Sequence, residues 1–272
     1  MSYLKLACLY FCLVFSTLLE ADDLVLESMQ SIRDVQHHKL DSEILERPFH
    51  LLIKLPPGAT DCSECRFPTV FLLDGGATFS TLAGYSNYLW HEEAVSEFIL
   101  VGISYGGETF EEGNYRSTDY TAPSEEREYW GGAENFQRVL AEEILPVVSA
   151  KYPVDPAHRI IFGQSLGGQF ILYTAMTQPG LFYGHISSNP ALHRNLDFFL
   201  QDRDGEGSTK LFVAVGSNDS PRFKPYSEQW IAHWQAKPDA PFELNAHELP
   251  GYGHFSILPE SFRLGLMWLL DK

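Results

Sequence analysis

The sequence predicts an α/β fold in which a mostly parallel sheet is covered by helices on both faces. Short runs rich in aliphatic and aromatic residues indicate strands, and the central runs are apolar on both faces, as buried parallel strands are. Helical patterns lie between several of these runs, and strands that alternate with helices form parallel sheets. The predicted strands are residues 69–74, 98–104, 159–163, 184–188, 210–216 and 242–249.

The first 21 residues differ from the rest of the chain. Lys5 is the only charged residue before Glu20. The apolar run 6–19 between them has the length of a signal-peptide core and is short for a membrane span. We therefore expect residues 1–21 to be a signal peptide and residues 22–272 to form one domain of a secreted or periplasmic protein. An uncleaved N-terminal membrane anchor is the alternative, and no membrane insertion is expected after cleavage.

The elements that follow are predicted from local patterns. Two extended stretches within residues 37–57 are joined near Glu46 and Pro48, which predicts a hairpin at a sheet edge. Pro146 should bend or shorten the last turns of the first helix that follows. The predicted helices, apart from the one after residue 165, are residues 131–152, 224–237 and 258–270.

Charge limits the partners of the protein. Asp and Glu number 36 against 19 Lys and Arg, which gives a net charge of -17. Nucleic acid phosphates and anionic lipid surfaces would be repelled, so neither is an expected partner. The sequence implies no metal and no other cofactor.

Cys62 and Cys65 are the two cysteines that remain once the signal peptide with Cys8 and Cys12 is removed. In an oxidising compartment, two thiols this close together are expected to form a small-loop disulfide. Free thiols are an alternative. A zinc site is less favoured because no second cysteine pair supplies the remaining ligands.

Ser165 lies between glycines where a strand pattern passes into a helical pattern, in the stretch RIIFGQSLGGQFILY. A G-x-S-x-G pattern at a strand–turn–helix junction is typical of a nucleophile elbow, in which a strained turn holds the serine hydroxyl above the sheet. The N–H of Leu166 would then point toward an oxyanion formed on attack. A glycine-rich packing turn without catalytic function is the alternative.

A serine nucleophile needs a base and an acid that orients the base. Asp219 follows the predicted strand 210–216, and His254 lies in the loop before the last helix, which matches the chain order serine, acid, histidine. We expect Ser165, Asp219 and His254 to form a catalytic triad. The alternatives for the acid are Asp197, Glu228 and Asp239, and the less favoured histidines are His185, His193, His233 and His247.

The second oxyanion donor is expected from the segment 72–80, LLDGGATFS, which we interpret as a loop. Its two glycines leave backbone N–H groups accessible, and Gly76 is the chosen donor. Asp74 is expected to hold this loop in place rather than to take part in the chemistry.

With these segments the sequence resembles the putative esterase family of α/β-hydrolases, which includes esterase D-like, feruloyl esterase-like and enterobactin esterase-like enzymes. The segments are FPTVFLLDGG, ILVGISYG, YRSTDYT, IFGQSLGG, VAVGSND and GHFSILPESFRLGLMWL. The resemblance covers the chain from about Leu40 to its end. It implies that the domain 22–272 has an α/β-hydrolase fold and hydrolyses a small-molecule carboxylic ester through an acyl-enzyme. TDYTAP and SSNPALHRN depart from the family pattern, which leaves the substrate class open.

The long segment 105–132 follows the carboxyl end of a predicted strand and should help to wall the site. Tyr115, Arg116 and Trp130 are its candidate substrate contacts. The alternative is a solvated loop in which Arg116 pairs with Asp119. An acyltransferase or a peptidase on the same scaffold, and a binding module without catalysis, are the alternatives to an esterase.

Overall fold

The computed structural model describes residues 32, 34–59, 62–92, 94–202 and 209–270. The expected signal peptide, residues 1–21, lies outside the described residues. Within them, no helix is long and apolar enough to cross a membrane.

Eight strands form one sheet in the order β1-β2-β4-β3-β5-β6-β7-β8. β2 runs antiparallel to β1 and β4, and every later neighbouring pair is parallel. The expected edge hairpin is confirmed, with its turn at residues 43–46. The strands are β1 (Gln36–Ser42), β2 (Arg47–Lys54), β3 (Phe67–Leu72), β4 (Ile99–Ser104), β5 (Val154–Gln164), β6 (Gly184–Ser188), β7 (Thr209–Gly216) and β8 (Phe242–Leu249).

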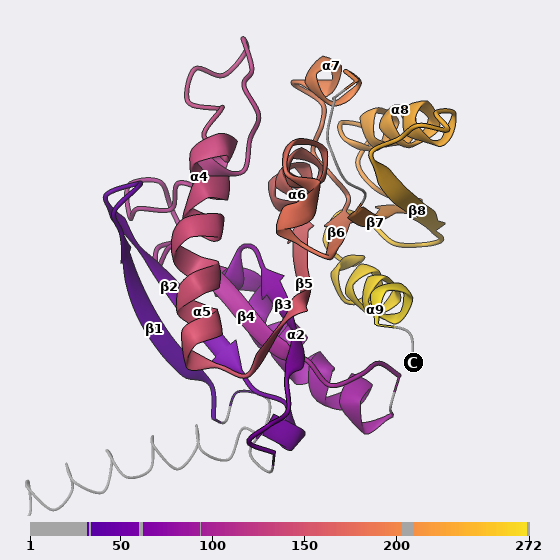
Figure 1. Ribbon diagram of the computed structural model, residues 1–272. Helices are drawn as coiled ribbons and strands as arrows, with labels where there is room; N and C mark the ends of the chain where they lie inside the picture. The colour runs from indigo at the N-terminus through magenta and orange to yellow at the C-terminus, as the bar shows by residue number, and fades with distance from the viewer. Residues whose placement is uncertain (1–31, 33, 60–61, 93, 203–208, 271–272) are drawn as a thin grey trace, which may run out of the picture.

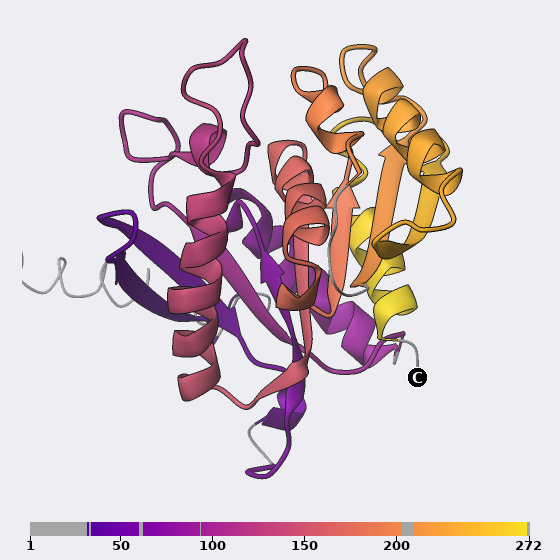
Figure 2. The ribbon, with the colours of Figure 1, turned by 45° about the horizontal axis from the view of Figure 1, so that its top comes forward.

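Helices cover both faces of the sheet, as predicted (Figure 1). They are α2 (Gly75–His91), α3 (Arg116–Asp119), α4 (Ala133–Val139), α5 (Leu145–Lys151), α6 (Leu166–Thr177), α7 (Leu196–Phe199), α8 (Lys224–Gln235) and α9 (Leu258–Leu269). Figure 2 shows α4, α5, α6 and α8 on one face and α2 with α9 on the other. Adjacent residues of a strand therefore enter different cores: Phe71 belongs to the cluster that includes Phe170 and Trp230, whereas Leu72 belongs to the cluster that includes Phe79 and Phe262.

The predicted helix at 131–152 contains an irregular turn. A five-residue π-helical segment, Leu140–Ile144, lies between α4 and α5 and directly precedes the first turn of α5, which contains Pro146. A proline cannot donate the i→i−4 hydrogen bond, and a widened turn accommodates this loss without ending the helix. The apolar stripe remains continuous, since Phe136, Leu140 and Ile144 are all fully buried.

Helix α2 corrects the sequence analysis, which interprets residues 72–80 as a loop. β3 ends at Leu72, and the helix begins at Gly75 after only two residues. Glycines and small polar residues give this segment a weak helix propensity, so packing against the sheet and α9 determines its structure. Its buried residues Phe79, Leu82, Ser86, Leu89 and Trp90 do recur at helical spacing, a signal that the strand-by-strand interpretation missed.

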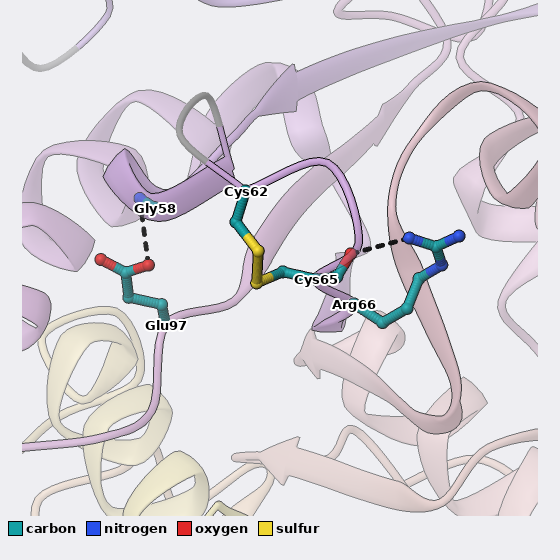
Figure 3. The surroundings of a disulfide bond; sticks show 5 residues. All are labelled: Gly58, Cys62, Cys65, Arg66 and Glu97. Carbon is teal, nitrogen blue, oxygen red and sulfur yellow. Dashed lines mark hydrogen bonds between the residues drawn. A yellow bond between two sulfur atoms is a disulfide. The ribbon is translucent and has the colours of Figure 1, made fainter.

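Cys62 and Cys65 are joined by a disulfide in the short segment that leads into β3 (Figure 3). Their Cα atoms lie 5.4 Å apart, and the bridge closes a loop of only four residues. The nearby turn around Gly58 is held to the start of β4 by a hydrogen bond from its N–H to the Glu97 carboxylate, 3.1 Å long. The disulfide therefore lies at the amino end of β3. Ser165 lies at the opposite, carboxyl end of the parallel strands.

Candidate active site

Ser165 occupies the single residue between β5 and α6. Its backbone adopts φ 58° and ψ −116°, a conformation that costs on the order of 1–3 kcal/mol for a residue with a side chain. A side chain at Gly163 would bring its Cβ within 2.5 Å of the Gly167 carbonyl, so strand and helix can approach this closely only with glycine there. The turn has the geometry of a nucleophile elbow, and its serine hydroxyl is partly exposed.

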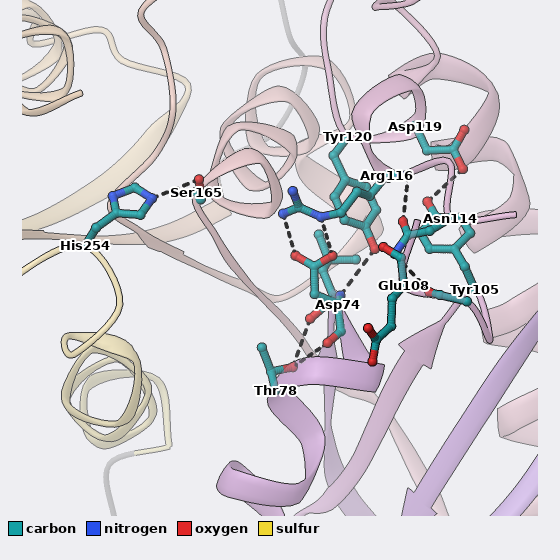
Figure 4. A network of polar contacts seen from close by, with 12 residues as sticks. Asp74, Thr78, Tyr105, Glu108, Asn114, Arg116, Asp119, Tyr120, Ser165 and His254 are labelled. Carbon is teal, nitrogen blue, oxygen red and sulfur yellow. Dashed lines mark hydrogen bonds and ion pairs between the residues drawn. The ribbon is translucent and has the colours of Figure 1, made fainter. Parts of the chain in front are cut away.

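The structure brings the three expected triad residues together. Nε2 of His254 lies 3.0 Å from Oγ of Ser165, and Nδ1 of the same ring lies 2.8 Å from Oδ1 of Asp219. Figure 4 shows the hydrogen bond between Ser165 and His254. The Asp219 side chain is fully buried, and the His254 side chain is 12 % exposed. In this arrangement the imidazole can accept the serine proton on one nitrogen while the carboxylate fixes the other.

The Asp219 carboxylate has few other partners. Oδ1 also accepts a hydrogen bond from the Ser220 N–H, 2.6 Å long. Oδ2 is buried with no hydrogen-bond partner among the described residues. The contact of Oδ1 with Nδ1 therefore fixes the orientation of the His254 ring.

The alternative acids lie elsewhere. Asp197, Glu228 and Asp239 are exposed, and Glu228 pairs with Lys224 on α8. His254 has its 2.8 Å contact with Asp219. The geometry thus favours Asp219 as the acid over each of the three.

Three side chains contact the loop that carries His254, and two of them come from neighbouring strand ends. The Gln164 amide donates to the His254 carbonyl, and Phe223 stacks on the imidazole with ring centroids 4.7 Å apart. The fully buried Asn189 donates to the carbonyls of Gly253 and His254, each at 3.2 Å. These contacts orient the His254 imidazole relative to Ser165.

Asn189 is a supporting residue that the sequence analysis missed. Its side-chain oxygen also accepts the Gly216 N–H at 2.8 Å, so one amide connects the end of β7 to the His254 loop. Its φ of 40° is in the left-handed region that asparagine tolerates. The available signal was its position directly after the buried strand β6, at the strand end where ligands bind in such sheets.

No other described histidine forms a hydrogen bond with the Ser165 hydroxyl. His185 is fully buried in β6, where burial lowers its pKa to about 3 and its Nδ1 pairs with the Thr209 hydroxyl. His233 lies on α8, and His247 lies on β8, an edge strand of the sheet. His193 lies in the loop after β6 and lines the same cavity as Ser165.

The two expected oxyanion donors each lie in the first turn of a helix. Leu166 is the first residue of α6, and Gly76 is the second residue of α2. N–H groups in a first helical turn have no intrahelical acceptor and can bind an oxyanion. Leu166 lines the cavity of Ser165, whereas Gly76 lines the neighbouring cavity next to Arg116.

Arg116 is tied to the segment that precedes α2, as Figure 4 shows. Its Nε and Nη2 donate to the two carboxylate oxygens of Asp74 at 2.7 and 2.8 Å. Burial works to lower the pKa of Arg116, but the Asp74 carboxylate outweighs burial and raises that pKa above its ordinary value. Asp74 has φ 54°, and its carbonyl accepts the N–H groups of Ala77 and Thr78. Arg116 therefore holds the backbone that presents Gly76.

Asp119, the alternative partner of Arg116, belongs to a separate buried pair. Its carboxylate binds Arg47 of β2 and accepts a 2.7 Å hydrogen bond from the Tyr105 hydroxyl. Burial raises the pKa of Asp119, and the Arg47 charge only partly opposes this. Tyr115 packs under the Arg47 guanidinium, 4.4 Å from its ring centroid, and is not among the residues that line the cavity of Ser165.

A cavity of about 260 Å³ opens at Ser165. Its wall includes Arg116 and Trp130, two of the three candidate substrate contacts, along with Leu166. The neighbouring cavity of about 440 Å³ shares Arg116, while a larger one of about 720 Å³ lies along α2 and contains none of the triad. The smallest of the three is the one that holds Ser165. In the described part of the chain, no cluster of three or more His, Cys, Asp or Glu is arranged to hold a metal ion.

Known proteins with similar sequences are named as esterases, in agreement with this geometry. A family model described as "Putative esterase" matches residues 42–251. The ferri-bacillibactin esterase BesA of Bacillus subtilis is 26% identical over 239 residues, which are 78% of this chain and 81% of that protein. The siderophore triacetylfusarinine C esterase of Aspergillus fumigatus is 28% identical over 196 residues, 65% of each chain.

Solved structures show the same fold. The BES protein from Bacillus cereus superimposes with a TM-score of 0.73 at 23% identity, covering 88% of this chain and 95% of that one. The siderophore hydrolase EstB from Aspergillus nidulans gives a TM-score of 0.73 at 20% identity, covering 90% and 96%. The predicted α/β-hydrolase fold is confirmed.

Proposed function

Because the chain belongs to the putative esterase family and is a carboxylic ester hydrolase, we propose that Ser165, Asp219 and His254 hydrolyse the ester through an acyl-enzyme. The observation that carries this proposal is the position of His254, with one ring nitrogen 3.0 Å from the serine hydroxyl and the other 2.8 Å from a buried carboxylate. No other described histidine forms a hydrogen bond with Ser165.

In the first step His254 takes the Ser165 proton while Oγ attacks the ester carbonyl. The N–H groups of Leu166 and Gly76 stabilise the oxyanion, and His254 then gives the proton to the leaving alkoxide. An acyl-enzyme remains on Ser165. Water, deprotonated by the same imidazole, attacks the acyl carbon and releases the acid, which restores the free serine.

The test of this mechanism is covalent labelling. A fluorophosphonate probe should label Ser165, and Ser165→Ala should abolish the label and lower turnover by several orders of magnitude. Phosphonate that attaches to another residue in the wild-type protein would assign the nucleophile elsewhere. Ser80→Ala, at a serine on α2 that lines the separate 720 Å³ cavity, is the matched control and should label fully.

We further propose a siderophore ester as the substrate, since the relatives with this activity in their names include the ferri-bacillibactin, triacetylfusarinine C and apo-salmochelin esterases. The purified protein is incubated with ferri-bacillibactin, with triacetylfusarinine C and with a feruloyl ester, and the products are separated by chromatography. Faster cleavage of the siderophores supports the assignment. Preference for the feruloyl ester, the substrate class of a structural neighbour with a TM-score of 0.67, contradicts it.

Export completes the proposal, supported by the apolar run 6–19 and by the paired Cys62 and Cys65. Mass spectrometry of the protein recovered from the medium or periplasm should show an N-terminus near residue 22. A full-length chain in the membrane fraction would favour the anchored alternative.

A further inference from the structure

The cavity at Ser165 is rich in arginine. The cavity that holds the serine is lined by Arg116, Arg127, Arg194 and Arg222, and none of the described residues in its wall is acidic. In the whole chain, Asp and Glu outnumber Lys and Arg by 36 to 19. A wall with four arginines and no acid is therefore the opposite of the average composition of this protein.

Two of the four arginines have carboxylate partners. Arg116 pairs with Asp74, and Arg194 pairs with Glu126 at 2.9 Å. In the part of the chain that the structure describes, no ion pair involves Arg127 or Arg222. Neither guanidinium is therefore paired directly with a described carboxylate at the cavity.

Arg222 makes two contacts that hold its guanidinium in place. Its Nη2 lies 3.3 Å from Nε2 of His193, and the guanidinium lies 5.3 Å from the ring centroid of Phe223. The same Phe223 ring stacks on His254, so Arg222 is connected through one aromatic ring to the base. A ligand bound by Arg222 would lie next to the reacting groups.

His193 lies in this wall, and the charges of the arginines affect its pKa. Burial lowers its pKa to about 4, the charges of Arg222, Arg194 and Arg127 act in the same direction, and the charge of Glu126 partly opposes them. The imidazole is therefore neutral at ordinary pH, and its Nε2 can accept a hydrogen bond from Arg222. The charge of the cavity comes from the arginines alone.

We infer that the cavity at Ser165 binds an anionic group of the ester substrate, a carboxylate or similar oxyanion, through Arg127 and Arg222 with support from Arg194. This inference rests on the proposed esterase function and specifies the charge of its substrate. A guanidinium binds a carboxylate through two parallel hydrogen bonds. A protein of net charge -17 repels anions in general, so it needs a local positive wall to admit one.

Trp130 and Phe223 line the same cavity and supply apolar surface beside the arginines. The substrate that fits this wall carries its anionic group on an apolar or aromatic body, close to the scissile ester. The anion can belong to the acyl part or to the alcohol part, and the experiment separates the two.

Two matched pairs of esters provide the test. The acyl pair is the mono-4-nitrophenyl ester of glutaric acid and the same ester with its free acid converted to an amide. The alcohol pair is the butyrate ester of 3-hydroxybenzoate and that of 3-hydroxybenzamide. We expect kcat/KM to be at least tenfold higher for the carboxylate member of one pair, and the pair that shows it identifies the side. Ratios within twofold of one in both pairs would overturn the inference.

Variants connect the preference to the arginines. Arg127→Gln and Arg222→Gln should each reduce the ratio of carboxylate to amide kcat/KM by threefold to tenfold, and Arg222→Lys should retain part of it. Arg138→Gln is the matched control, because Arg138 is an exposed arginine on α4 that pairs with Glu142 away from the cavity. Its ratio should equal that of the wild type. An equal loss in Arg138→Gln would show an effect of net charge and overturn the inference.

Binding separates this inference from the proposed function. Ser165→Ala should bind the carboxylate ester at least tenfold more tightly than the amide ester in calorimetry, and added 0.5 M salt should reduce the difference. Equal affinities overturn the inference even if the wild type hydrolyses both esters. Failure of the proposed function is instead seen as loss of both hydrolysis and phosphonate labelling, with the binding preference still measurable.

Discussion

Two carboxylates pair with basic side chains near Ser165, and they differ in what the partner can do. Asp219 is fully buried and faces His254, a base that can gain and lose a proton. Asp74 is 16% exposed and faces Arg116, whose charge is permanent and whose two donors fit both carboxylate oxygens. The first pair can take part in proton transfer, whereas the second can only hold a position.

The difference separates chemistry from positioning at one end of the sheet. Asp219 contacts the imidazole through Oδ1 and leaves Oδ2 without a hydrogen-bond partner among the described residues. Asp74 has both oxygens bound by Arg116, and its carbonyl caps the first turn of α2. We therefore expect substitutions in the two pairs to differ in size and in kinetic character.

The largest expected effect distinguishes the two carboxylates directly. Asp219→Asn should lower kcat by about ten-thousand-fold, because the wrong imidazole tautomer then faces Ser165. Asp74→Asn should lower it by about tenfold to hundredfold, through displacement of the Gly76 N–H. Stopped assays with a neutral 4-nitrophenyl ester measure both. Glu228→Gln, at an exposed acid on α8, is the control, and equal losses in the two aspartate variants would remove the distinction.

Substitution of Arg116 tests the Asp74–Arg116 ion pair through its basic partner. Arg116→Lys keeps the charge but loses the two-point contact with Asp74, so kcat for a neutral ester should fall by about tenfold. KM should change little, because the oxyanion exists only in the transition state. A rise in KM without a change in kcat would mean that Arg116 binds the substrate directly, as the sequence analysis expected.

Substitution of Asn189 tests how much its hydrogen bonds to the His254 loop contribute to stability and turnover. Asn189→Gly allows the positive φ but removes the bonds to Gly216, Gly253 and His254, and should lower the free energy of unfolding by about 1–3 kcal/mol. Denaturant titration measures this loss, and kcat should fall with it. An unchanged kcat would show that Gln164 and Phe223 are sufficient to orient the imidazole.

His193 sharpens the assignment of the base through pH. Its pKa is lowered to about 4, so it is neutral from pH 5 to 8, and His193→Gln should leave the pH at which kcat/KM is half-maximal unchanged. In the unfolded chain this histidine takes up a proton below pH 6.5, so its native-state contribution to stability is lost between pH 6.5 and 4. The variant should therefore show a weaker loss of stability in that window. A displaced activity midpoint would identify His193 as the base.

The smallest effect is expected from the disulfide, which lies away from both pairs. Cys62→Ala/Cys65→Ala should reduce the free energy of unfolding by about 2 kcal/mol, the amount expected for so short a loop. Thermal unfolding measures the change, with the reduced wild type as the control. Activity on a neutral ester should be retained, and a large loss would mean that the amino end of β3 is coupled to the strand end that precedes Asp74.

The sequence by itself determined the features that depend on neighbouring residues. Apolar runs and helical periodicity predicted the strands and several of the helices between them, and the glycines around Ser165 predicted the turn. The positions of Asp219 after a strand and of His254 before the last helix predicted that the three side chains meet, because the carboxyl ends of parallel strands share one edge. The structure brings them within hydrogen-bonding distance.

Only the tertiary structure decided which distant side chains become partners. Arg116 could pair with Asp119 three residues away, yet it reaches Asp74 on another strand end, while Asp119 pairs with Arg47 of β2. Of the arginines at the Ser165 cavity, Arg116 begins α3 and the other three lie in three different loops, so they are separated by up to about one hundred residues and nothing in the local pattern joins them. Short-range periodicity specifies helices and strands, but the partner of a long charged side chain depends on distances that exist only once the sheet has assembled.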